Sequence, residues 1–359
     1  MALLEYATLT VPDVVKKSVV SFYNRDPLLK ALQSRMQVKR SGGTNVRVVR
    51  VKSGHSDVVE INETNLSVPL AKRETLSAMT GDWAKYIKPV ILPHIDRDRM
   101  SSKEEVKRFV QDESGAAMQA LRNDVSRQIY LGNMTTLAGL STLNGARTSG
   151  TASGFANGAL QFQLPAAQAT EALTYLNETR VNDTTNFVDN WFNQFAIGTP
   201  GTNFLDAAQK LKITADTYAE DEEGIALAIC GIADHVDIGD ETRAATSAAG
   251  LTYSVADITS GKALPTVHMA NGVQYHANRW MTGTGASATV RGSGGANIDH
   301  PVYMINPNTV EYWVNANNDF RVTKFTDHLE TSNLEVQLAV TNPMANGAIN
   351  TAAVSSTTS

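Results

Sequence analysis

Apolar side chains recur every three or four residues along residues 101–133, and this spacing predicts one very long helix. Ser102 followed by Glu105 forms a capping box at its start, and Gly132 is the residue type that most readily closes a helix. The predicted helix spans residues 102–132 and is about 45 Å long, at about 1.5 Å per residue. Its apolar stripe, which we expect to lie in a core, consists of Val106, Phe109, Leu121, Val125 and Ile129.

The polar residues of this helix bear on the kind of helix it is. Its charged side chains fall largely on the other faces: Lys107, Arg108, Arg122 and Arg127. This polar side is too extensive for a membrane span. Gly115 is a weak point, at a cost of about 1 kcal/mol relative to alanine. Taken alone, the pattern is typical of a long core helix in a globular domain.

The pattern changes to extended segments at Asn45, in the stretch NVRVVRVKSGHSDVVEINE. Two valine-rich pieces flank the turn-forming KSGHS, which predicts a β-ribbon with a basic first arm and an acidic second arm. Such arms suit either pairing across the ribbon or contact with a neighbouring chain. A half-polar ribbon is marginal in water unless something covers it. The candidate contact residues are Arg47, Arg50, Lys52, Asp57 and Glu60.

The rest of the chain mixes helical and extended patterns and predicts an α+β fold. Helical spacing is found in DPLLKALQSRM, across residues 165–197 and in TNFLDAAQKLK. The extended segments are TLSAMTGDWAKYIKPVILPH, GIALAIC, ALPTVHMANGVQY, HPVYMINP, VEYWVNA, FRVTKFT and LEVQLAVT. The low-complexity tail NTAAVSSTTS is expected to fray.

Composition narrows the class of protein. The chain has 359 residues, 42% of them hydrophobic, and a net charge of -5, which suits a soluble chain of about two domains. It contains no apolar run of membrane-spanning length, and because MALLEYATLT lacks the basic flank and small-residue cleavage site of a signal peptide, we expect none. The lone Cys230 excludes an intramolecular disulfide framework, and we expect it to be buried and inert. The mild acidic excess argues against a dedicated nucleic-acid binder.

No motif with recognisable chemistry emerges. The histidines lack the spacing of metal ligands, and SGKAL and RGSGGAN match neither a phosphate loop nor a nucleophile elbow. The acidic AEDEEG is best explained as a solvated loop. The sequence therefore predicts no catalytic, cofactor-binding or metal-binding residues and no cofactor. Paired catalytic carboxylates need no fixed spacing, so a cytoplasmic α+β enzyme with an unrecognised carboxylate site remains an alternative.

The order of the elements is more informative than any single residue. An N-terminal arm, a charged ribbon, a return strand, a long helix, a glycine-rich loop, an α/β stretch and late strands follow one another. This order resembles the major capsid protein of tailed bacteriophages, the Hong Kong ninety-seven fold. The segment DVSRQIYLGNMTTLAGLSTLNG is similar to the end of that family's spine helix. Three further segments resemble its axial domain: TNFLDAAQKLK, GIALAICGIADHVDI and KALPTVHMANG.

The resemblance implies the domain layout of that capsid fold. The expected parts are an N-terminal arm (1–41), an extended loop or E-loop (42–88), a peripheral domain (89–154 and 313–350) with the spine helix (102–132), an axial domain (155–312) and a flexible tail (351–359). The axial domain would hold a central β-sheet flanked by helices.

The implied function is self-assembly into hexamers and pentamers of an icosahedral shell around double-stranded DNA. The protein would be made in the host bacterial cytoplasm and reside in the virion, with no membrane contact. Its partners would be further copies of itself, a portal protein, a separate scaffolding protein and, in some shells, a decoration protein, with weak non-specific contact to DNA. An encapsulin-like nanocompartment shell is the alternative. A lysine must lose its proton before its amine can form a covalent link to a neighbouring subunit. Lys52 lies beside a polar turn that does not favour loss of its proton, so we expect non-covalent shells.

Overall fold

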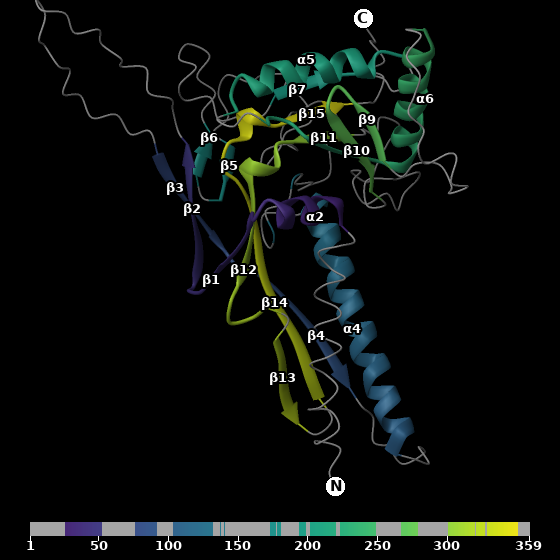
Figure 1. The fold of residues 1–359 in the computed structure, drawn as a ribbon. Coiled ribbons are helices and arrows are strands. Elements are labelled where there is room, and N and C mark those ends of the chain that lie inside the picture. The colour runs from purple at the N-terminus through teal and green to yellow at the C-terminus, as the bar shows by residue number, and fades with distance from the viewer. Residues whose placement is uncertain are drawn as a thin grey trace, which may run out of the picture.

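The structure, a computed structural model, has an elongated α+β fold, in agreement with the class expected from the sequence (Figure 1). Its described strands form a five-stranded sheet, a six-stranded sheet and two separate two-stranded pairs. The structure describes residues 26–51, 76–91, 103–131, 137, 140, 173–176, 178–180, 194–198, 202–219, 223–248, 267–278, 301–319, 321–326 and 329–350.

The five-stranded sheet is built around one long strand. This strand, β14 (Leu329–Val340), pairs antiparallel with β4 (Ala84–Ile91) along one edge and with β13 (Arg321–Thr326) and β12 (Val310–Asn315) along the other. β1 (Val38–Ser41) adds parallel to β12. The long helix α4 (Lys103–Leu131) runs along this sheet and contacts β4 and β14. The predicted helix and late strands are confirmed here.

The six-stranded sheet lies at the other end of the molecule (Figure 1). Its order is β7 (Gln194–Ile197), β15 (Gly347–Asn350), β11 (Pro301–Ile305), β8 (Leu227–Cys230), β10 (Val273–Ala277) and β9 (Val267–Ala270). The turn between β9 and β10 uses Asn271 and Gly272, both with positive φ (53° and 75°), as tight hairpin turns require. α5 (Phe204–Asp216) confirms the helix predicted in TNFLDAAQKLK, and α6 (Ile232–Ala248) follows β8.

The helical prediction for residues 165–197 is wrong where the structure describes this segment. Instead of helix it contains β5 (Leu173–Tyr175), β6 (Glu178–Arg180) and β7. β7 is a strand because it pairs in parallel with β15, about 150 residues further along the chain. A pairing partner so distant leaves no trace in local periodicity, and tertiary context overrides local propensity.

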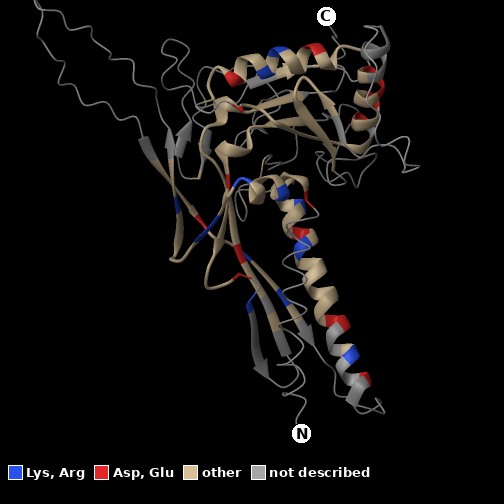
Figure 2. Ribbon diagram, in the orientation of Figure 1, with Lys and Arg blue, Asp and Glu red and all other residues tan. Residues whose placement is uncertain are grey.

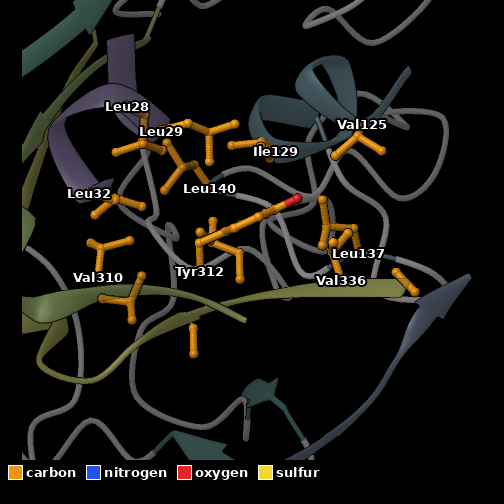
Figure 3. Close-up of a cluster of buried hydrophobic side chains, with 14 of the residues drawn as sticks. Leu28, Leu29, Leu32, Val125, Ile129, Leu137, Leu140, Val310, Tyr312 and Val336 are labelled. Atoms are coloured by element: carbon orange, nitrogen blue, oxygen red, sulfur yellow. The ribbon is translucent and has the colours of Figure 1, made fainter. Parts of the chain in front are cut away.

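One apolar core joins the two sheets. It contains residues of both sheets together with α4 and the short helix α2 (Pro27–Ser34), which confirms the helix predicted in DPLLKALQSRM. Figure 3 shows the part where α2, α4 and the long sheet meet: Leu28, Leu29, Leu32, Val125, Ile129, Leu137, Leu140, Val310, Tyr312 and Val336. A second cluster fills the space under α5, around Phe204 and Tyr275.

Candidate assembly surfaces

The ribbon is formed by β2 (Asn45–Val51) and β3 (Leu76–Asp82), which pair antiparallel with each other and with no other strand among the described residues. Val46 and Val48 on β2 are buried in the core. The alternate residues Arg47 and Val49 face solvent, and Val49 is 58% exposed. The ribbon thus has an inner face that belongs to its own chain and an outer face with an uncovered valine beside an arginine.

The base of the ribbon is anchored by several contacts. The indole Nε1 of Trp83 donates to the carbonyl of Gly43 at 3.0 Å, which closes β2 onto the end of β3. The side-chain amide of Gln337 on β14 donates to the carbonyl of Asp82 at 2.7 Å. At Gly81, a Cβ would lie 2.6 Å from a methyl carbon of Leu176, so a larger residue there would require this side chain to move. These contacts fix the direction in which the ribbon leaves the sheet.

β2 pairs with β3, so Arg47 opposes Thr80 and Arg50 opposes Ser77. The sequence left open whether the charged arms on either side of KSGHS pair with each other or contact a neighbouring chain, and the second of these arms lies outside the described residues. Lys52, Asp57 and Glu60 lie outside the described residues, as do SGKAL and RGSGGAN. Sequence alone offered two extended partners for β2. The burial of Met79 opposite Val48 shows the hydrophobic reason for choosing the later one.

The spine helix α4 buries one face along the five-stranded sheet. Leu121, Val125 and Ile129 of the predicted stripe are buried, Phe109 is half-buried, and Val106 lies in the helix with a side chain outside the described set. Arg122, which the sequence placed off the apolar stripe, is nevertheless only 8% exposed. A guanidinium on a long aliphatic stem can be buried where it has partners, and a periodicity argument does not detect this.

Two further exposed surfaces were not singled out by the sequence. On β4, Ile87 is 64% exposed beside the exposed Lys85 and Lys88. On α6, Ile232 and Val236 are 49% and 47% exposed, and Figure 2 shows acidic residues along the same helix. The spacing of four between Ile232 and Val236 is the signal that would have revealed the second surface, since it places both on one helix face.

The described residues contain no group of three or more His, Cys, Asp or Glu side chains that could hold a metal ion. Cys230 is fully buried, and burial, together with the charge of Asp234, raises the pKa of its thiol far above the usual value. A thiol held in this form is a poor nucleophile. In the described part of the chain, no helix is both long and apolar enough to cross a membrane.

No protein-family model and no curated protein matches the sequence. Among solved structures, the chain is similar to the cyanophage A-1(L) capsid asymmetric unit, with 14% identity, a TM-score of 0.49 and coverage of 90% of this chain and 92% of that one. It is also similar to the capsid of a native GTA particle, with 12% identity, a TM-score of 0.48 and coverage of 90% and 91%. A third similar structure is the SrpI encapsulin of Synechococcus elongatus, with 11% identity, a TM-score of 0.42 and coverage of 90% and 88%.

Proposed function

We propose that the chain is the major capsid protein of a tailed bacteriophage and assembles into an icosahedral shell. The observation that carries this proposal is the ribbon formed by β2 and β3. Its outer face presents the apolar Val49 and the basic Arg47, and it pairs with no strand beyond its own two among the described residues. A two-stranded ribbon is marginally stable by itself, and an uncovered apolar strand invites association. A neighbouring copy that covers this face would stabilise the ribbon and bury its exposed valine.

The layout expected for this family extends the proposal to the rest of the chain. The ribbon serves as the base of the extended loop, with Arg47, Arg50, Lys52, Asp57 and Glu60 as contacts to a neighbouring subunit. The five-stranded sheet with α4 serves as most of the peripheral domain, and the six-stranded sheet with α5 and α6 as most of the axial domain. Repeated copies then make hexamers and pentamers, which join portal, scaffolding and decoration proteins in the virion.

The shell is proposed to enclose double-stranded DNA without binding it tightly. A net charge of -5 makes strong binding of a polyanion unfavourable, so contact with the packaged genome is weak and independent of sequence. Weak contact suits a container whose contents must later leave.

Electron microscopy of the purified protein, with sedimentation analysis, tests the proposal. We expect closed shells, tubes or capsomers, alone or with a scaffolding protein from the same genome. A monodisperse monomer under all of these conditions contradicts it. Nuclease-protected DNA inside particles from infected cells distinguishes a phage capsid from an encapsulin-like compartment, which would instead contain an enzyme.

A further inference from the structure

A buried carboxylate lies at the start of α2. Asp26 is 5% exposed and caps this helix, with its Oδ1 accepting from the backbone amides of Leu28 at 3.0 Å and Leu29 at 3.3 Å. The same oxygen accepts from the hydroxyl of Tyr130 at 2.6 Å. Two of these bonds are local and ordinary for a helix cap. The third comes from a residue 104 positions away.

Tyr130 connects this cap to two other parts of the fold. It is fully buried in the last turn of α4, and its hydroxyl also hydrogen-bonds the side chain of Asn278. Asn278 directly follows β10, and its backbone amide donates to the carbonyl of Cys230 at the end of β8 at 2.8 Å. We name Asp26, Tyr130 and Asn278 the Asp26 latch. It joins the start of α2, the end of α4 and the six-stranded sheet.

The latch connects the two halves of the molecule. α4 contacts the five-stranded sheet along β4 and β14, whereas Asn278 belongs to the end of the six-stranded sheet. The latch is therefore a polar link between the two halves of the molecule, and its Tyr130 lies in the same buried cluster as apolar side chains such as Leu28 and Ile129. In such surroundings each hydrogen bond matters, because no water replaces it when it is lost.

Burial opposes the charge of the latch carboxylate. Burial raises the pKa of Asp26 and the bonds from Tyr130, Leu29 and Leu28 lower it by less, so that the pKa is about 6 instead of 3.8. Burial also raises the pKa of Tyr130 well above its ordinary value, so this hydroxyl keeps its proton. The other titratable side chains on the elements that meet here include Lys30 on α2, Asp124 and Arg127 on α4, Tyr275 and His276 on β10, and Cys230 on β8, with Asp234 and His235 on α6.

Two of these neighbours have shifted pKa values. Burial lowers the pKa of His276, and the nearby His235 and Lys30 lower it further. Burial and Asp234 keep the Cys230 thiol protonated, because they raise its pKa. Asp26 is thus the latch group whose charge changes in mildly acidic solution.

We propose that the Asp26 latch is a proton-sensitive connection between the two halves of the molecule, firm while Asp26 carries a proton and looser once Asp26 ionises. The proposal concerns the single chain and does not depend on shell assembly.

The direction of the effect follows from proton linkage. In an opened latch the solvated carboxyl has its ordinary pKa of 3.8, whereas in the closed latch it is about 6. The closed form therefore binds the proton more tightly, and the resulting stabilisation is complete below the lower pKa. It is lost as the pH rises through the upper one. From these two values, the opening equilibrium constant rises about tenfold between about pH 5 and about pH 7.5.

Hydrogen exchange on the full, unassembled chain tests this. Exchange of amides in α2, the last turn of α4 and β10 is measured by mass spectrometry across this pH range and corrected for intrinsic exchange rates. We expect opening of the wild-type latch to increase about tenfold. Asp26→Asn removes the titrating group and abolishes the increase. Asp206→Asn, an exposed carboxylate on α5, retains it.

Tyr130→Phe separates a titrating latch from a merely structural contact. It removes a hydrogen bond that favours ionised Asp26, so the pH at which opening increases moves upward, in addition to any uniform loss of stability. A wild-type protein without the increase, or an Asp26→Asn variant that keeps it, overturns the proposal. If Asp26→Asn does not fold, an unchanged midpoint in Tyr130→Phe overturns it instead.

Discussion

At the scale of single residues, backbone conformation and local space decide what a position tolerates. Gly115 lies in the middle of α4, and a Cβ added there meets no atom within 4 Å. Gly224 has a φ of +54°, and a Cβ there would collide with the carboxylate of Asp216. The first glycine only weakens its helix, whereas the second is required by its backbone.

Gly115→Ala is expected to stabilise the unassembled chain by about 0.5–1 kcal/mol, because alanine restricts the unfolded chain and favours helix. Urea unfolding followed by circular dichroism measures the free energy. Gly224→Ala is the matched control and should destabilise the chain. A loss of stability in Gly115→Ala would show that the middle of α4 has less room than the structure indicates.

At the scale of elements, α4 and the ribbon are stabilised in different ways. α4 buries Leu121, Val125 and Ile129 within its own chain, so its stability is largely internal. The ribbon buries Val46 and Val48 on one face only and leaves Val49 exposed on the other. A substitution on the inner face therefore reports on folding, and one on the outer face reports on association.

Val49→Asp is expected to leave the chain folded and to prevent normal assembly, because the new charge lies on the surface proposed to meet a neighbouring copy. Circular dichroism checks the fold and sedimentation checks the assembly. Val48→Asp is the matched control one residue away, where the side chain is 2% exposed. Its buried carboxylate should prevent folding, since it costs several kcal/mol of a total of about 5–15 kcal/mol. If Val49→Asp still formed normal shells, the outer face of the ribbon would not be part of the interface between copies.

At the scale of the whole molecule, one core cluster contains residues of both sheets, so the two halves fold as parts of one body. The proposed shell then depends on contacts between copies. Those contacts are proposed to be non-covalent, through interleaved arms and charge pairs of the ribbon, with a decoration protein in some shells.

Mature particles boiled in detergent are accordingly expected to run as one band near the chain mass of 38.7 kDa, or slightly below it after N-terminal trimming. Denaturing electrophoresis with reductant is the measurement. A ladder of multimers that survives this treatment would show covalent crosslinks, and mass spectrometry of the ladder would then identify the crosslinked residues.

The sequence by itself determined the elements that carry their own signals. The helices α2, α4 and α5 and the late strands β11 to β14 follow from local periodicity and capping residues, because these depend on neighbours within a few positions. Only the tertiary structure decided that β2 pairs with β3, that residues 194–197 form a strand and that Arg122 is buried. The link between Asp26 and Tyr130 is of the same kind, since two residues 104 positions apart are brought together only by the packing of α2 on α4. Local patterns specify which face of an element is apolar, but the choice of partner depends on burial that exists only once the chain has folded.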